Sequence, residues 1–225
     1  QIGRILKKLK KTGLDKNTIV VLTSDHGYHL GEHGHWQKQT LFDNATRVPL
    51  IFSGPKVPIG VISNSPVELI DIYPTLTDLT EIETPSHVVG RSLVPVFKKH
   101  DLKVRESALT RWKASQYKKE FEGYSIKTVR YRLTMWGKDG KEGFELYDHR
   151  NDKEELINLA NKIEYKSILD SLREHITFRI TDAMKKPLGL GRQFEERPLH
   201  KEVNYTPGDI HNIEGKRIYV KPSNE

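Results

Sequence analysis

Residues 24–38 hold the side chains with the greatest capacity for chemistry. The stretch reads SDHGYHLGEHGHWQK and places one aspartate, four histidines and one lysine within fifteen residues. A carboxylate suits Ca²⁺ or Mg²⁺, whereas imidazole suits Zn²⁺ and other transition metals. The segment therefore predicts a metal site without choosing the metal. The lysine beside it predicts that the partner of the metal is an anion.

Asp25 and His26 stand at the head of this segment, directly after the apolar run 18–23. Such a run predicts a buried strand, and open α/β sheets place their sites at the carboxyl ends of buried strands. We therefore interpret Asp25 and His26 as metal ligands. The competing interpretation is a structural Asp-His pair.

His29, His33 and His35 complete a His-x2-His-x3-His-x-His series that begins at His26. A zinc site uses three or four such groups, so a zinc centre is one hypothesis. The glycines between the histidines predict a folded loop in which not every imidazole can face one ion. The simpler interpretation is that these three histidines hydrogen-bond the loop backbone or line a cleft.

Lys38 is the cation of the segment. An ammonium group beside a divalent metal stabilises charge that develops on a transferred sulfuryl or phosphoryl group. We predict this role for Lys38, against the simpler interpretation of a solvated lysine. Trp36 is interpreted as a core residue or a cleft wall. Other carboxylates are interpreted as surface groups, namely Glu120, Glu122, Glu154 and Glu155.

The elements around this segment alternate between strand and helix. Helices are expected over 1–12, 41–46 and 72–80, and strands over 18–24 and 47–53. This alternation favours a mostly parallel sheet flanked by helices. We assign residues 1–95 to an α/β domain of this kind.

The pattern changes after residue 95. Short β-like runs surround the turn-rich stretch 137–143, and a helix is expected over 162–184. We interpret residues 96–185 as a small α+β subdomain with an antiparallel sheet and one helix. Residues 186–225 show little periodicity and are expected to form an extended tail, with a strand near 217–220.

The composition limits the class of protein. The 225 residues carry a net charge of +7 and no cysteine, which excludes disulfides and thiolate metal sites. No apolar run reaches the ~20 residues that a membrane-spanning helix needs, so no membrane span is expected. The positive charge is either a solvated surface or an attraction to a polyanion. No nucleic-acid-binding module is recognised, so no nucleic-acid partner is expected.

The segment from Thr23 to Phe52 resembles the type I sulfatases of the alkaline phosphatase superfamily. It is most similar to iduronate-2-sulfatases and related polysaccharide sulfatases. Further motifs follow in the order and spacing of a sulfatase C-terminal half: DIYPTL at 71–76, GRSL at 90–93, GYSIKT at 123–128 and ELYD at 145–148. The resemblance implies an alkaline-phosphatase-like α/β domain followed by a smaller subdomain with an antiparallel sheet.

The resemblance also implies an activity. Sulfatases hydrolyse sulfate esters with a formylglycine nucleophile and one Ca²⁺ ion that binds the sulfate. The implied substrate is a sulfated carbohydrate, with a 2-O-sulfated uronate in a polysaccharide as the candidate. Asp25 and His26 match two Ca²⁺ ligands, and Lys38 matches the lysine that contacts the sulfate and stabilises the leaving oxygen. The residues expected near the substrate pocket are Tyr28, His29, His33 and His35.

The nucleophile is expected upstream of this chain. The sequence holds no cysteine that could become formylglycine, and the first expected helix has neither a capping residue nor an initiator Met. We therefore interpret the chain as the later part of a longer polypeptide whose N-terminal half is its partner. The family resemblance suggests a secreted, periplasmic or lysosome-like location.

Two alternatives stay open at this point. One is a phosphodiesterase or phosphonate hydrolase of the same superfamily, with a Thr or Ser nucleophile and transition metals. The other is a non-catalytic relative that binds sulfated glycans.

Overall fold

The computed structural model describes residues 1–116, 119–185, 209–211 and 217–219. The chain divides into two units, 1–185 and 186–225. In the second unit β9 (Asp209–His211) pairs antiparallel with β10 (Arg217–Tyr219). β10 corresponds to the strand that the sequence predicts near 217–220. The rest of the expected tail lies outside the described residues, and the division into three parts at residues 95 and 185 stays a prediction.

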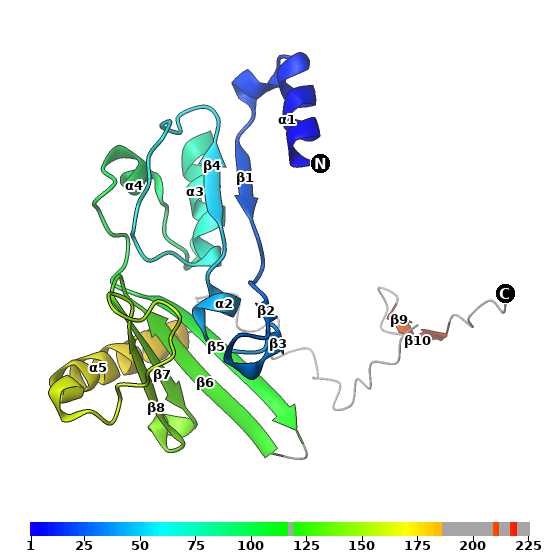
Figure 1. Ribbon diagram of the computed structural model, residues 1–225. Helices are drawn as coiled ribbons and strands as arrows, with labels where there is room; N and C mark the ends of the chain where they lie inside the picture. The colour runs from blue at the N-terminus through cyan, green and yellow to red at the C-terminus, as the bar shows by residue number, and fades with distance from the viewer. Residues whose placement is uncertain (117–118, 186–208, 212–216, 220–225) are drawn as a thin grey trace. The chain divides into compact units, whose positions relative to one another are not determined.

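The first part of unit 1 carries the chemistry-bearing segment between two strands (Figure 1). It begins with a helix and a 3-10 helix, α1 (Ile2–Lys11) and η1 (Leu14–Asn17). The site segment and its flanks then form β1 (Val20–Thr23), β2 (His29–Leu30), η2 (Glu32–Gly34), β3 (Trp36–Gln37), α2 (Asp43–Thr46) and β4 (Leu50–Ser53).

The sheet of this first part corrects the predicted fold class. β1 and β4 are antiparallel, with Thr23 opposite Leu50, and every strand pair among the described residues is antiparallel. The expected mostly parallel sheet is therefore not seen. A parallel pair needs a crossover, usually a full helix, whereas here the β2–β3 hairpin and the one-turn α2 bring the chain back at the end where β1 leaves. The strand that the sequence predicts to be buried is half-buried over residues 20–22, and β4 is the one strand among the described residues that pairs with it.

The next segment contains η3 (Leu69–Asp71), α3 (Ile72–Thr80) and α4 (Val94–Lys98). Asp71 occupies the N-cap position of α3, but its carboxylate makes no cap hydrogen bond. It accepts the backbone N–H groups of Glu68 and Arg91, each at 2.8 Å, and pairs with Arg105. Arg105 is buried, and a buried guanidinium without an anionic partner is strongly destabilising. Because the Asp71 carboxylate is used by these other partners, the expected helix 72–80 forms without a side-chain cap at its N-terminus.

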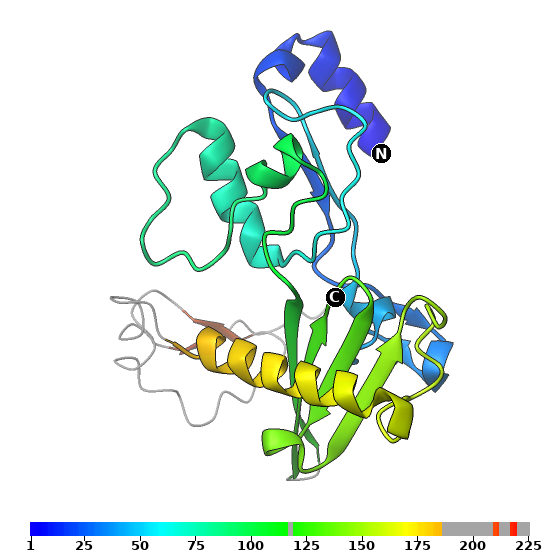
Figure 2. The ribbon, with the colours of Figure 1, turned by 90° about the vertical axis from the view of Figure 1, so that its left-hand side faces the viewer.

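The second part of unit 1 is an antiparallel meander with one helix on it, as the sequence predicts (Figure 2). Its strands lie in the order β5 (Ala108–Gln116), β6 (Lys119–Lys127), β7 (Tyr131–Trp136) and β8 (Gly143–Asp148). η4 (Lys138–Gly140) lies in the β7–β8 turn, and η5 (Ile163–Tyr165) precedes α5 (Lys166–Ala183). No helix in the described part of the chain is long and apolar enough to cross a bilayer.

The β5–β6 hairpin is longer than the sequence pattern predicts. Each strand has nine residues, whereas the apolar pattern stops at Thr110 and resumes at Tyr124. Charged residues interrupt the pattern in between, whereas the backbone pairing of the two strands continues past Thr110 and before Tyr124.

The two faces of this sheet differ in chemistry. Toward α5 an apolar core forms from Ile126, Leu133, Met135 and Ile176, with Leu109, Tyr124, Phe144, Leu169, Leu172 and Ile180 packed against it. Successive side chains of a strand point to opposite faces. The other face therefore carries Ser125, Arg132 and Thr134, all buried. Arg132 pairs there with Asp43, so this polar face contacts the first part of the unit.

Replacing Leu133 by alanine tests the core beneath α5. Leu133 is fully buried, so its truncation leaves a cavity. The free energy of unfolding is expected to fall by about 2–5 kcal/mol, measured by urea unfolding followed by circular dichroism. The control is Leu156→Ala, at a side chain that is 71% exposed. Its expected change is under about 0.5 kcal/mol, and equal losses in the two variants would contradict this core.

Candidate functional site

The candidate site begins where β1 ends. Oδ2 of Asp25 lies 3.3 Å from Nε2 of His26, and the Asp25 side chain is 81% exposed. Nζ of Lys38 donates to the same Nε2 at 2.7 Å. The β2–β3 hairpin turns the chain back so that Lys38 reaches His26. The structure thus brings together the three residues that the sequence analysis assigned to metal and anion.

The partners of His26 determine its tautomer. Nε2 accepts a hydrogen bond from Lys38, so the proton resides on Nδ1, which donates to the carbonyl oxygen of Gly27 at 2.6 Å. A metal-binding histidine is commonly held in this way, with one ring nitrogen on a backbone carbonyl and the other lone pair facing the ion. The geometry of His26 therefore fits a ligand role.

The Asp25 carboxyl is held in its charged form. Desolvation acts to raise its pKa, but His26, backbone N–H groups and Lys38 outweigh that effect and keep the pKa below its usual value. An anionic oxygen beside an imidazole lone pair is a donor set that can hold a divalent cation.

The other three histidines form a separate group. His29 is fully buried: Nδ1 donates to the carbonyl of Glu32 at 3.2 Å, and Nε2 accepts from the Thr40 hydroxyl at 2.7 Å. The ring of His33 stacks on Phe42 at 3.9 Å between centroids. His35 lies 6.0 Å from His29, ring to ring. These contacts support the shape of the loop.

The zinc hypothesis finds no support in this geometry. Among the described residues, no three imidazoles of the series bring ligand atoms together. Tyr28 is 53% exposed, and the predicted places of Tyr28, His29, His33 and His35 near a substrate pocket stay predictions. Trp36 is 68% exposed, so the interpretation as a core residue is wrong: no described element packs over its face of the β2–β3 hairpin.

Gly27 joins the site to α2. Its N–H donates to the carbonyl oxygen of Ala45 at 2.8 Å. A Cβ at position 27 would overlap the carbonyl oxygen of Asn44, so the close approach of the two backbones requires glycine. α2 therefore lies directly against the backbone that holds His26.

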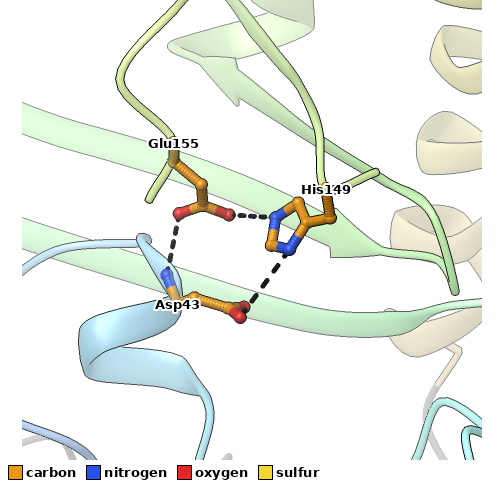
Figure 3. Close-up of side chains that lie close together, drawn as sticks. All are labelled: Asp43, His149 and Glu155. Carbon is orange, nitrogen blue, oxygen red and sulfur yellow. Dashed lines mark hydrogen bonds and ion pairs between the residues drawn. The ribbon is translucent and has the colours of Figure 1, made fainter. Parts of the chain in front are cut away.

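A buried cluster that the sequence pattern does not predict lies next to α2. Arg132 is 2% exposed and pairs with both Asp43 and Glu155. Nε2 of His149 lies 2.6 Å from Oε1 of Glu155, and Nδ1 lies 3.9 Å from Oδ2 of Asp43 (Figure 3). Glu155 is 2% exposed, so its interpretation as a surface carboxylate is wrong. His149 lies six residues from Glu155, but Arg132 and Asp43 lie 23 and 112 residues away, and no local pattern shows these two partners.

Asp43, His149 and Glu155 place one ligand atom each within 4.8 Å of one another, which is close enough for a metal ion. The guanidinium of Arg132 already pairs with both carboxylates. A second cation in this buried place would be repelled by Arg132 with little solvent screening. We therefore interpret the cluster as an ion-pair network that holds α2 to the sheet.

Comparisons with known proteins agree with the fold. Together they define the class as the C-terminal region of a type I sulfatase of the alkaline phosphatase superfamily. Within that class the chain belongs to the family described as N-sulphoglucosamine sulphohydrolase, C-terminal, whose profile matches residues 31–182.

Similar proteins include several sulfatases. A sulfatase of Formosa agariphila is 37% identical over 173 residues, which cover 77% of this chain and 32% of that protein. A Delta 4,5-hexuronate-2-O-sulfatase of Bacteroides thetaiotaomicron is 32% identical over 229 residues, covering 98% of this chain and 46% of that protein. The chain thus spans 32% of the length of the first relative and 46% of the length of the second.

Solved structures show the same fold. The structure of a 2-O GAG sulfatase superposes with a TM-score of 0.72 at 30% identity, over 80% of this chain and 40% of that chain. A phosphonate monoester hydrolase of Agrobacterium radiobacter superposes with a TM-score of 0.68 at 21% identity, over 98% of this chain and 42% of that chain. The second similarity concerns the fold alone.

Acid is expected to weaken the cluster around Glu155. Desolvation acts to raise the pKa of Glu155, but the hydrogen bond with His149 and the charge of Arg132 keep that pKa below its usual 4.5. A carboxyl with a lower pKa in the folded state contributes stability above its unfolded pKa. That contribution is lost as the pH falls from about 4.5 through the folded pKa.

Urea unfolding at a series of pH values below 4.5 measures this effect. The free energy of unfolding is expected to fall with acid more steeply in the wild type than in Glu155→Gln. The control is Glu154→Gln, at an exposed neighbouring carboxylate. If the free energy of unfolding of Glu155→Gln fell with pH as steeply as that of the wild type, the prediction would be contradicted.

Proposed function

We propose that this chain is the C-terminal part of a sulfatase that hydrolyses sulfate esters of a sulfated carbohydrate. The main observation that supports this proposal is that Asp25, His26 and Lys38 lie together at the end of β1. The candidate substrate is a 2-O-sulfated uronate in a polysaccharide. Two similar proteins described as a hexuronate-2-O-sulfatase and a 2-O GAG sulfatase support it. The net charge of +7 suits a polyanionic substrate.

One Ca²⁺ ion is proposed as the cofactor, held in part by Asp25 and His26. The Asp25 carboxylate supplies the hard anionic oxygen that Ca²⁺ prefers, and Nε2 of His26 lies 3.3 Å from it. Ca²⁺ takes roughly 6–8 ligands. The remaining ligands and the formylglycine nucleophile are proposed to come from the N-terminal half of the same protein. When bound, the ion supplies positive charge that binds the sulfate.

Lys38 is proposed to act on the reacting group. Its ammonium lies 2.7 Å from Nε2 of His26, next to the proposed cation ligands. For Nε2 to bind the ion, the Lys38 ammonium must turn its N–H groups away from that lone pair, and a sulfate oxygen is the proposed acceptor. As the bond between sulfur and the sugar oxygen breaks, negative charge grows on the leaving oxygen. Lys38 stabilises that charge.

Replacing Lys38 by alanine in the complete enzyme tests its role. Loss of one donor to the developing charge is expected to lower kcat by roughly 10²–10³-fold, measured as sulfate released from a sulfate ester. The control is Lys16→Ala, at an exposed lysine of η1. Turnover by Lys38→Ala at the wild-type rate would remove Lys38 from the mechanism.

Replacing Asp25 by asparagine tests the proposed cation site. The amide keeps the size of the side chain but loses its charge, so Ca²⁺ affinity is expected to fall by about tenfold or more. The measurement is the rise of Tm with Ca²⁺ concentration, which reports ligand binding to the folded state. The exposed Asp101→Asn is the control. An identical Ca²⁺ dependence in Asp25→Asn and the wild type would exclude Asp25 as a ligand.

A phosphonate hydrolase or phosphodiesterase of the same superfamily is the second candidate, because the fold that the chain shares with the phosphonate monoester hydrolase does not by itself distinguish the two activities. The upstream nucleophile motif and the metal content of the complete protein separate the two. A Cys-x-Pro-Ser-Arg motif with Ca²⁺ supports the sulfatase. A Thr or Ser nucleophile with two transition ions per site supports the alternative. Glycan binding without sulfate release would support a non-catalytic relative.

A further inference from the structure

α2 is a helical turn that its own residues do not stabilise. It has four residues and no side-chain cap. Isolated helices shorter than about 12 residues are marginal in water, and the first N–H groups of a helix lack partners within it. Here Oε2 of Glu155 accepts the N–H of Asp43 at 2.8 Å across 112 residues of sequence. Glu155 therefore acts as a distant cap for α2.

Arg132 binds both ends of the same turn. Its guanidinium pairs with the carboxylate of Asp43, the first residue of α2, and donates to Oγ1 of Thr46, the last residue, at 3.1 Å. It also pairs with Glu155. Both residues lie in the second part of unit 1, so the antiparallel sheet and the loop after β8 determine where α2 lies.

The position of α2 reaches the site through Gly27. The carbonyl of Ala45 accepts the Gly27 N–H at 2.8 Å, and the carbonyl of Asn44 lies against Cα of Gly27. The carbonyl of Gly27 then accepts Nδ1–H of His26 at 2.6 Å. An unbroken series of direct contacts therefore joins Glu155 and Arg132 to the imidazole of His26.

We infer that Arg132 and Glu155 are positioning residues for His26. By holding α2 they hold Gly27, and Gly27 fixes both the ring orientation and the tautomer that presents the Nε2 lone pair. The inference rests on the proposed function, in which His26 binds Ca²⁺. Groups that orient a metal-binding histidine through its other nitrogen raise metal affinity without touching the ion.

The test compares Arg132→Met and Glu155→Gln with the wild-type complete enzyme. Ca²⁺ binding, measured by titration calorimetry, is expected to weaken by about tenfold in Arg132→Met. Raising the Ca²⁺ concentration is expected to restore kcat. Hydrogen exchange of the Gly27 amide is expected to accelerate in both variants, while amides of the β6–β7 ladder stay protected.

Arg105→Met is the matched control. Arg105 is also a buried guanidinium, 5% exposed, and it pairs with two carboxylates, those of Glu68 and Asp71, away from α2. Its loss is expected to lower Tm without changing Ca²⁺ affinity or the exchange of Gly27. This variant separates a general loss of stability from a specific effect on the site.

Unchanged Ca²⁺ affinity and unchanged Gly27 exchange in a folded Arg132→Met would overturn the inference. An equal loss of affinity in Arg105→Met would also overturn it. If Arg132→Met does not fold, the more conservative Glu155→Gln decides by the same two measurements. A wild type that binds no Ca²⁺ would refute the proposed cofactor, whereas the Gly27 exchange, which needs no metal, would still decide the positioning role.

Discussion

The rest of unit 1 depends on one constraint, the burial of the Arg132 guanidinium. A buried charge must be paired, because leaving it alone costs several kcal/mol. The two anionic partners of Arg132 come from different places: Asp43 lies on α2, and Glu155 lies in the loop after β8. Satisfying this one side chain therefore docks the site-bearing segment onto the antiparallel sheet. That segment packs through apolar contacts as well, since Leu41 and Ala45 are buried and the ring of Phe42 lies 6.0 Å from that of Tyr147.

The antiparallel sheet can hold the site-bearing segment because its two faces differ in chemistry. One face packs Leu133 and Ile126 against α5, which supplies the apolar core of the second part of the unit. The alternating positions on the same strands present Arg132, Ser125 and Thr134 to the other side. The period of two in a strand makes both faces from one stretch of sequence. A stable core and a polar docking surface therefore coexist within four short strands.

The sequence predicts the helices and turns that depend on local patterns, but it does not predict the direction or length of the strand pairs. The apolar spacing of α1, α3 and α5 and the turn between β7 and β8 are local signals, and the structure shows each of these elements. The prediction of a mostly parallel sheet is wrong for the β1–β4 pair, which is antiparallel. Alternation of strand and helix does not reveal the end of β1 at which the chain returns. The full length of the β5–β6 hairpin was missed, since its charged residues hide a ladder made by backbone groups.

The sequence by itself determined the residues of the candidate site. Asp25, His26 and Lys38 lie within one short segment whose tight turns depend on glycine, so their types and spacing already indicated a cation beside an anion site. Tertiary structure alone decided that His29 supports the loop and that Nε2 of His26 accepts from Lys38, because the burial of His29 and the orientation of His26 depend on hydrogen-bond partners. It alone also showed that Glu155 holds α2 in place. The two are 112 residues apart along the chain, and only folding brings such groups into contact.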